Sequence, residues 1–144
     1  MKPIVRNTLA VLAGLVVGSL VNMGLIMVSG QVIPPPTDAD VTTLEGLRSS
    51  IHLFEPKHFL FPFLAHGLGT LAGAFVAARL ATSHAFALAL TVGCAFLAGG
   101  VANVFMLPSP MWFNVVDLVG AYIPMAWAGW RLAPPARQRQ GSGS

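Results

Sequence analysis

The amino-acid sequence predicts an all-α membrane protein with four transmembrane helices, and its composition is the first support for this fold class. Hydrophobic residues make up 55% of the chain and charged residues only 9%, whereas soluble domains contain roughly 25% charged residues. The mean hydropathy of +0.72 points the same way. A second support is the division of the chain into four long apolar segments. At 144 residues we expect one domain.

The first apolar segment follows Lys2 and Arg6 and predicts a transmembrane helix over about residues 4–29. It is longer than the roughly 7–15 apolar residues of a secretory signal, so we expect it to stay in the mature protein. Gly14-x-x-x-Gly18 is a spacing that lets membrane helices pack closely. The alternative is that these glycines only reflect how common glycine is in such helices.

An extramembrane loop over residues 30–55 connects the first two helices. Thr42-x-x-Glu45 has the form of a helix capping box. Apolar residues then recur at helical spacing, at Leu44, Leu47, Ile51 and Phe54. We therefore expect a short amphipathic helix that lies over the end of the bundle, as a cover or as a plain connector.

The remaining transmembrane helices are expected over about residues 56–81, 84–106 and 110–132, so that the membrane domain covers residues 1–133. Pro56 and Pro110 suit the first turn of a helix. Pro124 predicts a kink in the last helix, because proline cannot donate a backbone hydrogen bond. Residues 134–144 form a polar tail, and its last four residues, Gly-Ser-Gly-Ser, resemble an artificial linker.

Basic residues predict the orientation in the membrane. Most of them fall on the side of the two termini, namely Lys2, Arg6, Arg79, Arg131, Arg137 and Arg139. The positive-inside rule then places both termini in the cytoplasm and the long loop outside. A bacterial inner membrane is the expected location. Because the basic residues flank membrane segments instead of clustering on one helix face, we expect no nucleic-acid binding.

The two halves of the chain resemble each other. Gly18-x-x-x-Asn22 is matched by Gly99-x-x-x-Asn103, and His66-x-x-Gly69 by Asp117-x-x-Gly120. This pattern predicts a duplicated helix pair, related by an axis along the membrane normal. Chance recurrence of small residues is the alternative.

Small residues also predict helix packing. We expect close packing at six glycines, Gly14, Gly18, Gly69, Gly73, Gly99 and Gly120. A bundle of four helices has little room for a pore, and its glycine faces favour a homo-oligomer.

Polar side chains inside the apolar segments mark the candidate site. His66 lies near the middle of the second helix, and Asp117 lies in the half of the fourth helix nearer the loop. An ionisable residue in hydrocarbon costs about 2.5–3.5 kcal/mol on the gentlest scale, so the two should pair inside the bundle. We expect four further residues to extend the network: Asn22, Asn103, Thr70 and Tyr122.

Two functions fit this pattern. The first is a small channel or transporter whose pathway for a solute, ion or proton passes His66 and Asp117. The second is an accessory or scaffold subunit that binds a protein partner through the external loop, with the polar residues serving only to fix helix register. An acid–base pair acting on a lipid head group ranks third. No hydrolase, metalloprotease or phosphate-binding motif is present, so an enzyme is less expected.

Neither a cofactor nor a metal is expected. His52-x-x-Glu55-x-x-His58 offers ligands for a divalent cation, but Pro56 interrupts it and no fourth ligand follows. Methionines near the loop would suit copper(I), although methionine as an apolar filler explains them better. Cys94 stands alone in an apolar segment and implies no disulfide or zinc site.

Overall fold

The computed structural model describes residues 1–134 and, within them, contains helices and no strand. The all-helical fold class is therefore confirmed, and the predicted tail lies outside the described residues from position 135 on. The helices are α1 (Pro3–Val32), α2 (Leu44–Ser50), α3 (Leu60–Leu80), α4 (Ala85–Met106), α5 (Met111–Gly120) and α6 (Ile123–Leu132). Two 3₁₀ turns, η1 (Ile51–Leu53) and η2 (Pro56–Phe59), join α2 to α3.

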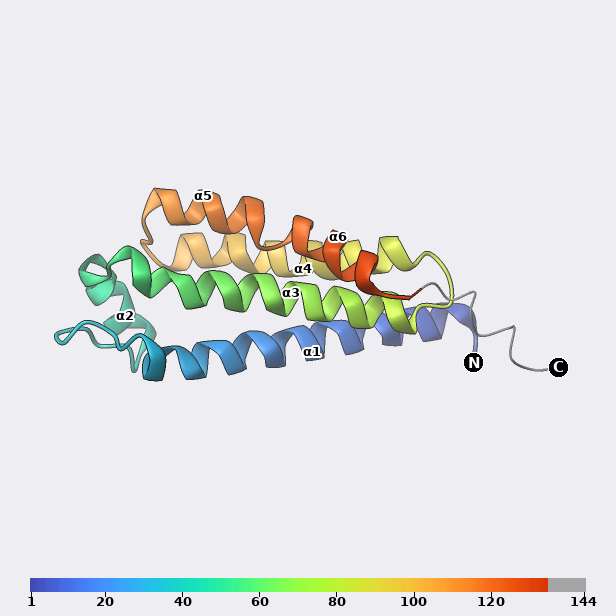
Figure 1. The fold of residues 1–144 in the computed structure, drawn as a ribbon, viewed down its shortest axis with the longest axis horizontal. Coiled ribbons are helices and arrows are strands. Elements are labelled where there is room, and N and C mark those ends of the chain that lie inside the picture. Colours follow the sequence, from blue (N-terminus) through green and yellow to red (C-terminus); the bar gives the residue numbers. More distant parts are fainter. Residues whose placement is uncertain (135–144) are drawn as a thin grey trace.

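Three helices are long and apolar enough to cross a membrane: α1, the continuous stretch Pro56–Leu80, and α4. They run lengthwise through an elongated bundle, with α5 and α6 following one another along the same direction (Figure 1). Their ends lie within three residues of the predicted ones. Large apolar side chains on α1, among them Leu12, Val16 and Leu20, are more than half exposed, as hydrocarbon rather than water would require.

The fourth predicted helix is not continuous, which corrects the expected kink within one helix over 110–132. It is divided into α5 and α6 at Ala121 and Tyr122. Pro124 is the physical reason, because its ring has no N–H to donate and clashes with the carbonyl of Gly120, one turn earlier. Tyr122 leaves the regular helical backbone, with φ −116° and ψ −75°, and a new helix starts after it.

Helix α3 lies between α1 and the pair of α5 and α6 (Figure 1), and its contact with α1 is made by glycines. A Cβ atom on Gly14 would lie 2.5 Å from the carbonyl oxygen of Gly73, and one on Gly18 would lie 2.6 Å from that of Gly69. The two small-residue motifs thus face each other across an antiparallel pair and bring the backbones together. These glycines pack as predicted, but within one chain, so they no longer argue for a homo-oligomer.

The other two glycines of the predicted packing set behave differently. Gly120 packs at ordinary van der Waals distance, 3.5 Å, from the ring of Phe63. The close packing expected at Gly99 is absent, because a Cβ there would meet no atom within 4 Å. The duplicated helix pair is not confirmed either, since α3 is one continuous helix whereas its proposed counterpart is broken into two.

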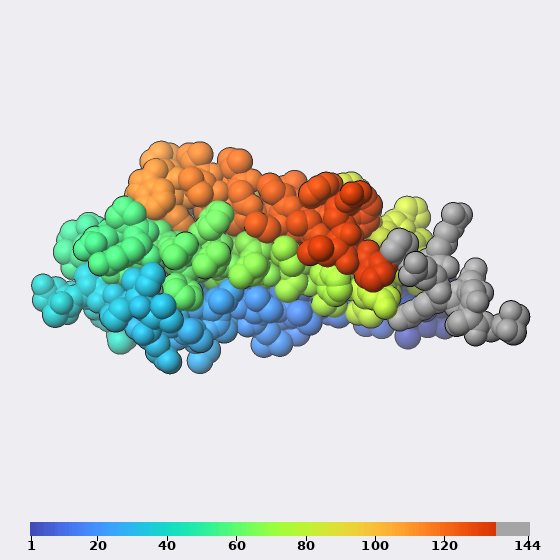
Figure 2. Space-filling model, in the orientation of Figure 1, coloured from blue at the N-terminus to red at the C-terminus, as the bar shows by residue number. Residues whose placement is uncertain are grey.

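The loop of residues 33–59 folds over one end of the bundle, which we call the loop end (Figure 2). Its helix α2 is present, but the cap is Thr43, whose hydroxyl accepts from the Gly46 N–H, and not Thr42. The Arg48 guanidinium donates to the backbone oxygen of Met106 at 2.6 Å. An apolar cluster of Ile51, Phe59 and Phe113 also holds the loop against the helices.

At the opposite end, Asn7 ties α1 to the turn between α3 and α4. Its side-chain oxygen accepts from the hydroxyl and the backbone N–H of Thr82, at 2.8 and 3.0 Å. Its amide nitrogen donates to the Ser83 hydroxyl at 3.0 Å. The N-cap position of α4 is taken by His84, with φ 54° and no side-chain cap bond.

The glycine contact predicts that Gly14→Val destabilises the bundle by about 1–3 kcal/mol, the usual cost of overpacking. The new side chain would collide with the Gly73 carbonyl, which belongs to a rigid backbone. Gly24→Val is the matched control, because it lies in the same helix and a Cβ there meets nothing within 4 Å. Equal losses for both variants, measured by unfolding in mixed detergent micelles, would contradict the proposed role of this contact.

Candidate functional site

The centre of the candidate site is a hydrogen-bonded His–Asp pair between α3 and α5. His66 Nδ1 lies 2.8 Å from Asp117 Oδ1, so the pairing predicted from their depths is present. The Asp117 side chain is only 6% exposed and that of His66 19%. An ionised carboxylate can only accept, so His66 Nδ1 carries the hydrogen and donates it. A charge-assisted bond of this kind is what allows a carboxylate to be buried among apolar helices.

Tyr122 completes the partners of Asp117 from the break between α5 and α6. Its hydroxyl donates to Asp117 Oδ2 at 3.0 Å, and the residue is 2% exposed. Its ring also stacks on that of His66, with centroids 5.8 Å apart and an interplanar angle of 26°. Both carboxylate oxygens thus have a donor, one from α3 and the other from the helix break. Tyr122 was expected to extend the network, and it contacts both of its central members.

Close packing at glycine brings these elements together. A Cβ on Gly100 of α4 would collide with the Tyr122 hydroxyl, and one on Gly93 would lie 2.5 Å from the Ala126 side chain. On α3, the backbone oxygen of Leu71 lies where a Cβ on Gly129 would be crowded, at 2.5 Å. Small residues on α4 and α6 therefore let the broken helix approach α3 closely enough for Asp117 to reach His66.

Beside the pair lies a cavity of about 160 Å³, which we call the central cavity. It is bounded by α1, α3, α4 and the helix break, and its lining consists of Asn22, His66, Gly69, Thr70, Phe96, Gly99, Gly100 and Tyr122. Its size would accommodate a few water molecules at roughly 30 Å³ each. Gly99 borders this cavity but is itself exposed at the bundle surface, so a Cβ there meets no atom within 4 Å.

Asn22 reaches the central cavity from α1 but does not bond to the His–Asp pair. Its Oδ1 atom is buried and has no hydrogen-bond partner among the described residues. Such an acceptor costs about 1–3 kcal/mol unless a donor is supplied to it. Thr70 is fully buried and donates to the His66 backbone oxygen at 2.7 Å. Both residues thus line the cavity, instead of extending the network to the His–Asp pair as the sequence predicted.

Asn103 was expected in the polar network around His66 and Asp117, but it lies outside that network. Its side chain lines a second cavity, toward the loop end of the bundle. The residue count along α4 sets the depth of Asn103, but not the direction in which its side chain projects. Gly99, one helical turn away, occupies the corresponding place at the central cavity. Phe96 and Gly100 were missed as lining residues, since an apolar residue and a glycine carry no polar signal in the sequence.

The arrangement leaves one ring nitrogen of His66 available to a hydrogen-bonding group. His66 uses Nδ1 for Asp117, and its other ring nitrogen, Nε2, has no hydrogen-bond partner among the described residues. A carboxylate that fixes the tautomer and orientation of a histidine leaves the opposite nitrogen free to accept.

The positions of the side chains support neither of the two alternative metal sites, the one at His52, Glu55 and His58 or the one at the methionines. His58 is engaged within the loop: its Nδ1 accepts from the Glu55 N–H at 2.9 Å, and its Nε2 lies 3.2 Å from the Pro34 oxygen. Within residues 1–134, no three His, Cys, Asp or Glu side chains lie close enough together to hold a metal ion. Methionines near the loop end, such as Met106 and Met111, are exposed at the bundle surface.

Comparison with known proteins adds no relative to this geometry. No protein-family model, curated protein or solved structure matches the chain. A function can therefore be inferred only from the geometry of the site.

The His–Asp pair predicts a coupling energy of about 0.5–3 kcal/mol between His66→Ala and Asp117→Ala in a double-mutant unfolding cycle. Each single change leaves its partner unpaired in the bundle, so the double variant should lose less than the sum. Asn7→Ala combined with Asp117→Ala serves as the control cycle, since Asn7 bonds only at the turn between α3 and α4. That control should be additive within about 0.5 kcal/mol. Additivity in the His66 cycle would rule out a functional or structural pair.

Proposed function

We propose that the chain is a small integral membrane protein that moves a small solute or a proton across the bilayer through a site at His66 and Asp117. The proposal includes a fourth span, formed jointly by α5 and α6. These helices have 10 residues each, with two residues between them. At 1.5 Å per residue they reach roughly 30 Å, about the thickness of the hydrocarbon core.

One observation carries the proposal: the fourth element is broken at the place where its polar residues meet His66 and a cavity. Irregular backbone at membrane depth is tolerated only where it is buried in protein or lines a cavity. Broken helices at the midplane are a recurring way in which transporters build their sites. Tyr122, the residue at the break, both lines the central cavity and bonds Asp117.

A purely structural role would favour a closed network in which every buried polar atom has a partner. Asn22 Oδ1 departs from that expectation, because it is buried beside the cavity without a donor. A transported group with a hydrogen to donate would satisfy it. This supports transport over the scaffold alternative, in which the loop binds a protein partner and the polar residues only fix helix register.

We further propose that both termini face the cytoplasm and that the loop end faces outward, in a bacterial inner membrane. The support is the excess of basic residues on the side of the termini. In this orientation the central cavity lies between the loop end and Arg79, which is in the last turn of α3 on the cytoplasmic side.

Proteoliposomes test the proposed function. We expect the parent protein to speed either the collapse of an imposed pH gradient or the osmotic swelling caused by small neutral solutes. His66→Ala and Asp117→Asn should reduce that rate by about tenfold or more, equivalent to about 1.4 kcal/mol. Each removes one partner of the pair at the cavity.

Thr91→Ala is the matched control and should keep the parent rate. Its hydroxyl is on the exposed face of α4 and bonds only to the Ala87 oxygen of the same helix. Flux equal to that of empty liposomes, or unchanged flux in both site variants, would overturn the transport proposal and leave the scaffold alternative.

A further inference from the structure

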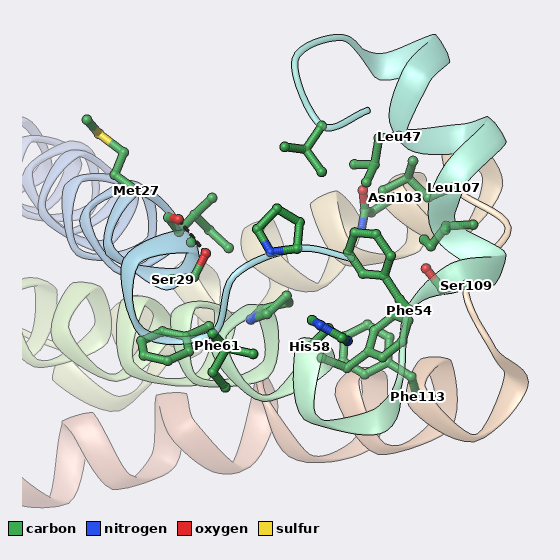
Figure 3. Close-up of a pocket in the computed structure, with 18 residues that line it drawn as sticks. Met27, Ser29, Leu47, Phe54, His58, Phe61, Asn103, Leu107, Ser109 and Phe113 are labelled. Atoms are coloured by element: carbon green, nitrogen blue, oxygen red, sulfur yellow. Dashed lines mark hydrogen bonds between the residues drawn. The ribbon is translucent and has the colours of Figure 1, made fainter. Parts of the chain in front are cut away.

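A second and larger cavity of about 370 Å³ lies under the loop, and we call it the loop-side cavity (Figure 3). Leu47 of α2, together with Phe54, covers it from the loop, while Met27 and Ser29 of α1 and Asn103 of α4 bound it from the bundle (Figure 3). Its volume falls in the range of small-molecule sites, about 300–1,000 Å³. The lining is mainly apolar and aromatic, with a few polar groups, as such sites usually are.

The two cavities are stacked along the same three helices. Ile26, Pro62 and Asn103 line the loop-side cavity, and each lies four residues, or about one turn of roughly 5.4 Å, from a residue that lines the central cavity. Those counterparts are Asn22, His66 and Gly99. In all three helices the step from the first set to the second leads away from the loop end. The loop-side cavity therefore adjoins the central cavity on the side of the loop.

Charge is nearly absent from this pair of cavities. Among the described residues that line them there is no Asp, Glu, Lys or Arg, and the only ionisable side chains are His58, His66 and Tyr122. His58 already uses both ring nitrogens within the loop. An ion that left water for such surroundings would lose its hydration without meeting a side chain of opposite charge on the cavity wall. A neutral molecule with hydrogen-bonding groups would not meet this penalty.

We infer that the loop-side cavity is the access route to His66 and that the route takes uncharged solutes that can donate hydrogen bonds. The inference depends on the proposed transport function and names its substrate class and its direction of access. Two hydrogen-bond acceptors lie at the central cavity, where the route ends: Asn22 Oδ1, which is buried without a partner among the described residues, and His66 Nε2. Asn103 and Ser109 supply polar groups on the way.

Cysteine labelling in lipid nanodiscs tests the route and the charge selectivity together. The reporter is Gly99→Cys in a Cys94→Ala background, because a Cβ at Gly99 projects into open space and Cys94 is exposed. The probes are iodoacetamide and iodoacetate, which have similar size and the same chemistry but differ in charge. In both, the thiolate sulfur bonds to the methylene carbon and iodide leaves. Dividing each rate by that of an exposed loop reporter, Thr37→Cys, removes the intrinsic difference between the reagents.

We expect Gly99→Cys to prefer iodoacetamide by about tenfold or more after this normalisation, because burying the carboxylate is costly. Adding Asn103→Trp should block the loop-side cavity and slow the labelling of Gly99→Cys by about tenfold. Val101→Cys is the control for reagent arriving through lipid, since Val101 lies two residues from Gly99 on the same helix, is 40% exposed and lines neither cavity. It should react far more slowly than Gly99→Cys.

Three results would overturn the inference. No labelling of folded Gly99→Cys, or labelling unaffected by Asn103→Trp, would show that the loop-side cavity is not the route. Equal normalised rates for the two reagents would refute the preference for uncharged solutes. Labelling of Val101→Cys as fast as that of Gly99→Cys would place the path in the lipid. Because labelling requires no transport, these outcomes are independent of the flux assay that tests the proposed function.

Discussion

The pairing of Asp117 is the constraint on which the rest of the structure depends. A carboxylate that is almost fully buried among apolar helices needs donors for both of its oxygens. His66 supplies one from α3, and Tyr122 supplies the other from the helix break. In a straight helix, positions 117 and 122 would lie about 140° apart around the axis, because five residues turn through about 500°, and they would be on different faces. The break at Ala121 and Tyr122 therefore allows the Tyr122 hydroxyl to reach the carboxylate of Asp117 within the same span.

The glycine contacts set the geometry of the site as well as the stability of the bundle. Gly69 lies against the Gly18 carbonyl and next to Asn22, whose Cβ would be 3.1 Å from a Cβ on Gly69. The same backbone approach that holds α1 against α3 thus carries the Asn22 amide to the central cavity. A looser contact would move Asn22 away from His66. Packing and the candidate function are coupled through one helix pair.

Much of the helical framework could be predicted from the sequence, because apolar length and the positions of proline and glycine mark the helix ends. The pairing of His66 with Asp117 was also predictable, since depth and the cost of burial restrict the possible partners. The direction of Asn103 was not, because depth is set by residue count whereas direction depends on how α4 rotates against its neighbours. The cavities were not predictable either, since they result from the packing of several helices, which no local pattern encodes.

The balance between satisfied and unsatisfied polar groups separates the two functional hypotheses. Asp117 has donors on both oxygens, and Thr70 bonds within its own helix, so these residues alone would make a closed structural network. Asn22 and the free nitrogen of His66 do not fit it, because both present acceptors where the bundle offers no donor. Leucine at position 22 would avoid the cost of the buried amide oxygen. The buried Asn22 oxygen therefore needs a donor from the central cavity, either water or a solute, which helix register alone does not supply.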